Sequence, residues 1–317
     1  MRMSYTKSLL QTVAAALIFA AIPSALFAQW APYPTPGVPK LADGKPNMEG
    51  PTPRTADGKP DFSGIWVFEG TRRARAAGGP GVIAGSGPGA AAAPGAASAT
   101  AATPPPAPAP PPAGGVGLGP RPAGISEFFD IGSTVPGGLP FTPWAVAVRK
   151  ERKDNNNKDN PDAHCLPLGL TQLHMHPQPR KIIQTPGLIV ILYEAQGGVR
   201  QIFMDGRALP SSDAEPWWYG YSIGHWDGDT LVVETNGFRD DVWLDVEGSP
   251  LTNTGKMTER FRRVSFGHLE MEITIEDPKA YTHPWTVKMK QRLLLDTDLI
   301  EFICNENEKS DAHLVGK

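Results

Sequence analysis

The stretch LEMEITIED, residues 269–277, decides the fold class of this chain. Apolar side chains occupy every second position, and glutamate or threonine fills the positions between them. Successive side chains of a β-strand point to opposite faces, so this pattern predicts a strand with one apolar face and one wet face. The apolar residues are Leu269, Met271, Ile273 and Ile275.

Similar short runs, separated by turn residues, precede and follow this segment. The Asp-Gly turns at Asp205–Gly206 and Asp227–Gly228 are typical of hairpins. About ten strands at such spacing favour an antiparallel sheet over a parallel α/β sheet. The sequence therefore predicts a mainly β chain whose antiparallel meander closes into a barrel. The expected strands are 62–68, 181–184, 188–194, 199–204, 219–226, 230–235, 257–264, 269–277, 285–295 and 299–304.

One short helix is predicted at Phe141–Arg152 (FTPWAVAVRKER). Thr142 is a candidate N-cap directly before a proline, apolar residues follow at helical intervals, and basic residues come last. The polar run from Lys153 to Asp162 ends the helix.

The start of the chain has the order of a secretory signal. Arg2 and Lys7 precede an apolar run that ends at the small residue Ala28, which predicts a signal peptide over 1–28. A retained membrane anchor is the alternative, but polar residues interrupt the run, which is shorter than the ~20 apolar residues of a stable span. We expect a periplasmic or secreted protein with no membrane span after signal cleavage.

The remaining chain divides by composition. Residues 29–60 repeat the turn phrase ADGKP and predict an extended N-terminal segment, and 61–73 contain the first strand of the barrel. Residues 74–124 are almost entirely Ala, Pro and Gly, which predicts a disordered insertion because few apolar side chains offset the entropy of ordering it. Residues 125–317 are expected to form the helix and β-barrel domain.

The net charge and the cysteines predict two further properties of the chain. The formal net charge of −3 gives no basic surface for nucleic acid, so no nucleic-acid partner is expected. The two cysteines are Cys165 and Cys304. In an oxidising compartment they are expected to form one intramolecular disulfide, with a catalytic thiol as the alternative.

Two resemblances follow from these motifs. The Gly64-x-Trp66 sequence in the first strand, the basic run at Arg260, Arg262 and Arg263, and the serial hairpins resemble the lipocalin or calycin plan. That resemblance implies a Trp under one barrel end that packs against an Arg. The insertion after the first strand departs from the lipocalin layout.

The second resemblance covers most of the mature chain. The segments DGKPDFSGIW, CLPLG, QTPG, FMDGR, GYSIGHWDGDTLVVETNGF, TERFRR, EDPKAYTHPWT and CNENE are together similar to a widespread family of secreted bacterial proteins of unassigned function. This resemblance implies export and a β fold, and it supplies no catalytic residues.

Histidines suggest a metal site. His174 and His176 are two residues apart, and on an extended segment they would point to the same side and could share a metal ion. The segment also resembles part of a cupin metal motif, but the following glutamate is absent. The third ligand is expected to be His225, and zinc or copper would suit three imidazoles. The other candidates for this ligand are His268, His283 and Glu194. The competing interpretation is two ordinary surface histidines.

An aromatic strand suggests a ligand site. Tyr219, Tyr221 and His225 lie at alternate positions and would face the barrel interior together, with Arg207 or Glu194 as polar partners. The competing interpretation is that they only fill the core. Trp217 and Trp218 are expected at the mouth of the pocket, where Trp218 would also contact the ligand. The preferred function is a β-barrel that binds a small apolar or aromatic ligand. The alternative is a metal-assisted extracellular hydrolase, lyase or oxidative enzyme that uses His174 and His176.

Overall fold

The structure, a computed structural model, describes residues 33–69, 130–304 and 306. These residues belong to one compact unit, and the second unit, 71–123, lies outside them. The predicted signal peptide (1–28) and the predicted Ala/Pro/Gly insertion (74–124) likewise lie outside the described residues.

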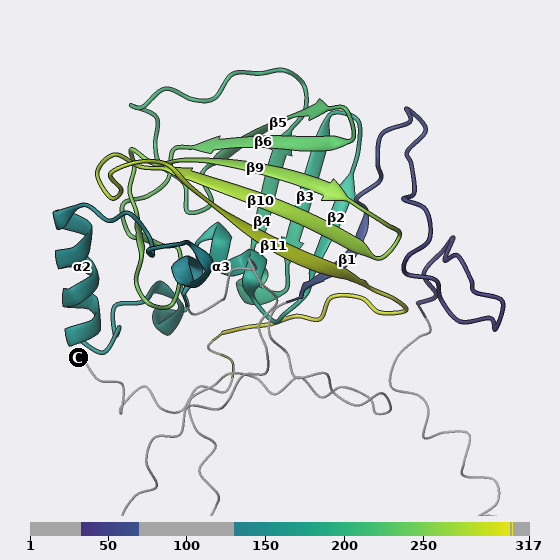
Figure 1. The fold of residues 1–317 in the computed structure, drawn as a ribbon, viewed down its shortest axis with the longest axis horizontal. Coiled ribbons are helices and arrows are strands. Elements are labelled where there is room, and N and C mark those ends of the chain that lie inside the picture. Colours follow the sequence, from purple (N-terminus) through teal and green to yellow (C-terminus); the bar gives the residue numbers. More distant parts are fainter. Residues whose placement is uncertain (1–32, 70–129, 305, 307–317) are drawn as a thin grey trace, which may run out of the picture. The chain divides into compact units, whose positions relative to one another are not determined.

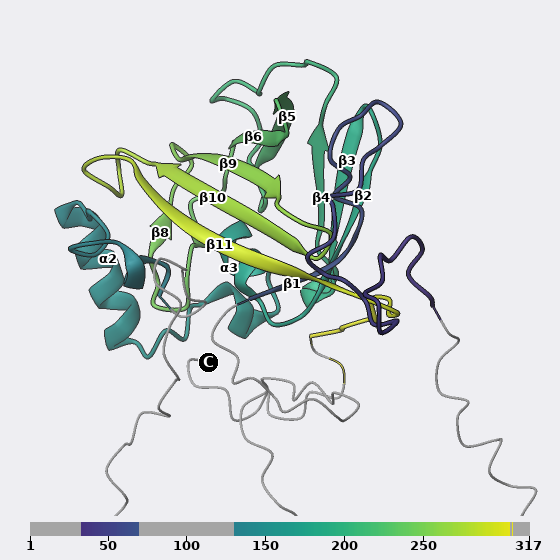
Figure 2. The ribbon, with the colours of Figure 1, turned by 45° about the vertical axis from the view of Figure 1, so that its right-hand side comes forward.

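Nine strands form a closed barrel in the order β1-β11-β10-β9-β6-β5-β4-β3-β2, so the predicted mainly β barrel is confirmed (Figures 1 and 2). β1 closes the barrel because it pairs with β11 on one side and β2 on the other. The strands are β1 (Gly64–Phe68), β2 (Arg180–Gln184), β3 (Leu188–Tyr193), β4 (Val199–Phe203), β5 (Tyr221–Asp227), β6 (Thr230–Asn236), β9 (Lys256–Arg263), β10 (His268–Glu276) and β11 (Trp285–Leu294).

The alternating segment at 269–277 behaves as predicted. Its apolar residues in β10 are fully buried, and Met271 among them lies opposite Phe261 of β9 and Met289 of β11. Glu270 and Glu272 face outward and pair with lysines of β11. The two-residue period of the strand thus separates core from solvent.

Two features depart from a simple meander. β4 and β5 are parallel, and only Ile202–Ser222 and Phe203–Ile223 are paired between them, because the long connection 204–220 returns the chain to the same end of the barrel. The connection between β6 and β9 carries the two-stranded pair β7 (Val242–Trp243) and β8 (Pro250–Leu251). The predicted strand at 299–304 is wrong, because among the described residues no strand pairs with this segment.

The predicted helix is confirmed as α2 (Pro143–Asp154), and the Thr142 hydroxyl accepts a hydrogen bond from the amide of Ala145. Sequence analysis missed α3 (Leu170–Met175). α3 is six residues long, and its polar residues Thr171, Gln172 and His174 are as buried as its apolar ones, so the order of polar and apolar residues does not mark an exposed helix face. Single-turn helices η1 (Ile131–Thr134), η2 (Pro161–His164) and η3 (Ala195–Gly197) complete the described structure.

Trp66 and Arg263 close one end of the barrel. The Trp66 indole is fully buried, and the Arg263 guanidinium lies 5.0 Å from its ring centroid. Arg263 also donates hydrogen bonds to the carbonyls of Asp61, Ser265 and Phe266. Through these hydrogen bonds Arg263 ties the segment before β1 to the end of β9.

The predicted disulfide is confirmed. Cys165 and Cys304 are bonded, with their Cα atoms 5.6 Å apart. The bond anchors the C-terminal segment beside the chain that leads into α3. In the part of the chain that the structure describes, no helix is long and apolar enough to cross a membrane.

Candidate functional site

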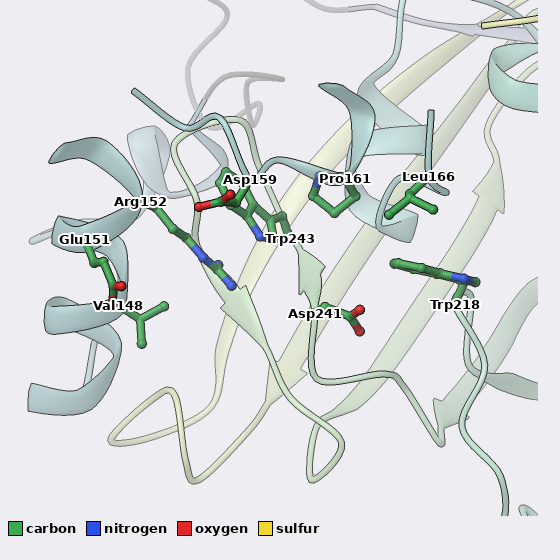
Figure 3. A pocket seen from close by; sticks show the side chains of 9 residues that line it. All are labelled: Val148, Glu151, Arg152, Asp159, Pro161, Leu166, Trp218, Asp241 and Trp243. Atoms are coloured by element: carbon green, nitrogen blue, oxygen red, sulfur yellow. The ribbon is translucent and has the colours of Figure 1, made fainter. Parts of the chain in front are cut away.

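A cavity of about 310 Å³ lies beside the barrel, and two tryptophans line it. We call it the indole cavity. Figure 3 shows Trp243 and Arg152 toward one side, Trp218 and Leu166 toward the other, and Pro161 and Asp241 between them. Its lining residues are Val148, Glu151, Arg152, Asp159, Pro161, Leu166, Trp218, Asp241 and Trp243.

Trp243 and Arg152 build one wall of the indole cavity. Trp243 belongs to β7, and its ring is almost completely buried. The guanidinium of Arg152, near the end of α2, lies 4.3 Å from the centroid of that ring and donates a hydrogen bond to the carbonyl of Gly248. The cation–π contact and the hydrogen bond together fix the position of α2 relative to β7.

Trp218 forms the opposite wall. Its indole is partly buried, and the guanidinium of Arg239 lies 4.6 Å from the ring centroid. Arg239 also pairs with Asp241, whose side chain reaches the cavity. Each of the two indoles therefore already has a guanidinium packed on it.

The charges that line the cavity are mixed. Burial lowers the pKa of Arg152 to about 10, although neighbouring acidic groups, including Asp159 and Glu151, oppose that shift. Arg152 therefore remains a cation at neutral pH. The carboxylates of Glu151 and Asp159 are exposed, and Pro161 lies between the two indoles (Figure 3).

A second cavity, of about 570 Å³, lies at the end of the barrel near Gly64 and Leu293. Its two cationic side chains are already engaged, since Lys181 pairs with Asp298 and Arg263 binds backbone carbonyls. The indole cavity is lined by two tryptophans, of which Trp218 is only partly buried, and it is the stronger candidate for ligand binding.

The structure corrects the orientation of the aromatic strand β5. Ser222 lies opposite Thr235 of β6, and their hydroxyls are 2.9 Å apart in the barrel interior. Tyr221 and His225, one residue out of phase, therefore face outward, and His225 is exposed. Tyr219 precedes the strand and packs against Tyr193, with ring centroids 6.3 Å apart.

The predicted polar partners do not converge on one ligand site. Arg207 lies on the outer surface, where it donates to the Tyr221 hydroxyl and stacks on Phe203. Glu194 is buried, and its carboxylate accepts a hydrogen bond from the amide of Ile300. Of the six predicted ligand residues, Trp218 alone is among those that line the indole cavity.

The histidines occupy a different setting from the predicted one. His174 is in helix α3 and His176 is its C-cap, so the expected extended segment is wrong. Among the described residues, no three His, Cys, Asp or Glu side chains lie close enough to share a metal ion, so His225 does not join the other two.

His174 instead belongs to a buried network inside the barrel. Its Nε2 lies 2.9 Å from a carboxylate oxygen of Glu259, and Arg200 pairs with the same carboxylate through two nitrogens. Arg200 also donates hydrogen bonds to the hydroxyls of Ser222 and Thr235. Arg200 on β4 thus spans the sparsely paired seam between β4 and β5 from the inside.

Burial and pairing set the ionisation of this network. Burial alone raises the pKa of Glu259, but the charge of Arg200 and hydrogen bonds from His174 and Arg200 outweigh it and hold the pKa at about 2. Burial lowers the pKa of His174 to about 4 despite the hydrogen bond with Glu259. At neutral pH the network is a carboxylate–guanidinium pair with a neutral imidazole.

Sequence analysis missed Trp243 and Arg152. Trp243 lies in the two-residue strand β7, which is too short to give a sequence pattern. Arg152 was predicted only as the end of a helix. Their contact joins distant parts of the chain, so local patterns contain no signal for it.

No known protein family, curated protein or solved structure matches the chain.

Proposed function

We propose that this chain is an exported β-barrel protein that binds a small apolar or aromatic molecule in the indole cavity. One observation carries the proposal: Trp218 and Trp243 line the same cavity from two separate segments of the chain. Tryptophan contributes a large apolar surface, and two indoles on one cavity favour a flat ligand that packs against them.

The dimensions and the chemistry of the cavity support this ligand class. A volume of about 310 Å³ is at the lower end of the range for small-molecule sites. The apolar side chains of Leu166 and Pro161 add to the indole surface, and Arg152 and Asp241 supply the few polar groups that orient a ligand.

In this proposal the ligand does not bind inside the barrel, and the barrel only supports the segments that form the indole cavity. The interior is packed with side chains, and a Cβ atom added at Gly224 would come within 2.6 Å of the Met204 sulfur and 2.9 Å of Ile202. The ligand therefore binds beside the barrel, where α2 and the β7 segment meet, rather than on the interior face that sequence analysis favoured.

Export is part of the same proposal. It is supported by the signal-like start of the chain, by the similarity of its motifs to secreted bacterial proteins, and by the Cys165–Cys304 disulfide. Disulfides persist in oxidising compartments and are rare in the cytoplasm.

A panel of neutral aromatic fluorophores, titrated into the disulfide-intact mature chain, tests the proposal. We expect at least one dye to show a saturable emission change with one site per chain, and a non-fluorescent aromatic competitor to reverse it. A panel in which every response rises linearly with dye concentration would contradict ligand binding.

A further inference from the structure

Arg180 is a buried guanidinium that the indole cavity does not use. It is the first residue of β2, and it is 1% exposed. Burial lowers the pKa of Arg180 to about 10, so the side chain keeps its charge at neutral pH. A buried charge normally has a counterion, because removing it from water costs several kcal/mol.

Only one nitrogen of this side chain has partners. Nη1 donates to the backbone carbonyl of His174, at 2.7 Å, and lies 3.4 Å from the Nδ1 atom of the same residue. Nε and Nη2 have no hydrogen-bond partner among the described residues, although both are buried. These two nitrogens form one edge of the planar guanidinium.

The neighbouring carboxylates are already engaged. Glu259 receives hydrogen bonds from Arg200 and His174. Glu194, the residue directly after β3, accepts a hydrogen bond from the amide of Ile300. Arg200 already neutralises the carboxylate of Glu259, and Arg180 forms no ion pair with a carboxylate of the described residues.

The C-terminal end of α3 compensates part of the charge. The carbonyl of His174 points at Nη1, and the partial negative charge of a helix end favours a cation. That contact satisfies the opposite side of the guanidinium and leaves the Nε–Nη2 edge without an acceptor.

We propose that the Nε–Nη2 edge of Arg180 binds a small monovalent anion, a halide or a carboxylate of the size of formate. Two parallel N–H groups on one guanidinium edge match the two oxygens of a carboxylate, and charge-assisted hydrogen bonds of this kind are among the strongest in proteins. The anion neutralises the excess cation beneath α3 and so links α3 to the barrel wall. The site is separate from the indole cavity.

Bromide diffraction tests the site directly. Crystals of the mature, untagged chain grown in sodium bromide should give an anomalous peak within hydrogen-bonding distance of Nε and Nη2 of Arg180. Bromide peaks at surface positions alone, with none at Arg180, would mean an adventitious ion only and would overturn the proposal.

The second test measures the midpoint of thermal unfolding at constant ionic strength. Formate is compared with gluconate, an anion that is bulkier than the proposed ligand. At a formate concentration one hundred times the dissociation constant, the midpoint of the wild-type protein should rise by roughly 5–10 °C. Arg180→Met should remove this rise. The matched control is Arg263→Met, which loses another buried guanidinium but should keep the formate dependence. Equal responses in wild type and Arg180→Met would overturn the site.

Discussion

The guanidinium of Arg152 lies 4.3 Å from the centroid of the Trp243 ring, and this contact joins α2 to the β7 segment across the indole cavity. Arg152 also reaches the carbonyl of Gly248, so one side chain fixes both the helix and the turn that carries the indole. The wall of the cavity therefore depends on a contact between segments that are far apart in the sequence.

Replacing Arg152 should weaken this wall. Arg152→Met keeps most of the aliphatic stem but removes the cation and the hydrogen bond to Gly248, so we expect a loss of about 1–3 kcal/mol in the free energy of unfolding. Urea denaturation measures it. Lys150→Met on the same helix is the control, since the exposed Lys150–Asp154 pair should contribute under about 1 kcal/mol. Equal losses in the two variants would contradict a specific role for Arg152.

The Arg200–Glu259 pair should be strongly coupled. Glu259→Gln leaves the buried Arg200 without its carboxylate, and breaking a buried pair in this way costs about 3–5 kcal/mol. The double variant Arg200→Met/Glu259→Gln should lose much less than the sum of the single variants, because no uncompensated charge remains. A double-mutant cycle by denaturation checks this, and strict additivity would be inconsistent with a direct pair.

Acid should destabilise the protein through His174 and His176. Burial is the main cause that lowers the pKa of each histidine from 6.5 to about 4. Between these pH values the unfolded chain binds protons that the folded chain does not. The free energy of unfolding should therefore fall as pH decreases from 6.5 to 4, by about 1.4 kcal/mol per pH unit for each histidine.

Glu259 adds a second loss at lower pH. Its pKa is held at about 2 in the folded protein against a usual 4.5, so its contribution is present above pH 4.5 and disappears as pH falls toward 2. Denaturation at a series of pH values measures both effects. His174→Gln should flatten the upper part of the curve. The same slope in the wild type and in His174→Gln would refute the assignment.

Reduction of the disulfide should lower stability. The Cys165–Cys304 bond joins residues separated by 139 positions, and the chain-entropy model gives a stabilisation of up to about 5 kcal/mol for such a loop. Mass spectrometry of the oxidised protein should find no alkylatable thiol, and Cys165→Ser/Cys304→Ser should unfold at lower urea. Two alkylatable cysteines in protein freshly purified without a reductant would contradict the bond.

Sequence patterns predicted the barrel because most of its strands have one apolar and one polar face. The same reasoning gave the wrong orientation for β5, because the barrel interior next to β5 is polar. Ser222 faces inward and accepts a hydrogen bond from Arg200, while the more apolar Tyr221 and Ile223 face outward. A buried charge network thus inverts the usual pattern. Amphipathicity alone could not identify which face of this strand lies inside.

The candidate site was less accessible to prediction. Trp217 and Trp218 were expected together at the mouth of a pocket in the barrel. Trp218 lines the indole cavity beside the barrel, and Trp217 is not among the residues that line it. Its partners Trp243 and Arg152 come from a short irregular segment and a helix end, and only tertiary packing brings them together. Likewise, the polar residues of α3 are as buried as its apolar ones, so their order does not mark an exposed helix face, and its histidines were placed on an extended segment.

The most direct test of ligand binding compares two adjacent tryptophans. Trp218 lines the indole cavity, whereas Trp217 packs against Tyr221 on the outer surface, with ring centroids 5.4 Å apart. The neutral naphthalene dye prodan is titrated into wild type, Trp218→Ala and Trp217→Ala at equal concentrations of folded protein. The account predicts saturable binding whose dissociation constant rises at least about tenfold, about 1.4 kcal/mol, in Trp218→Ala and stays unchanged in Trp217→Ala. Equal dissociation constants in all three proteins would contradict it.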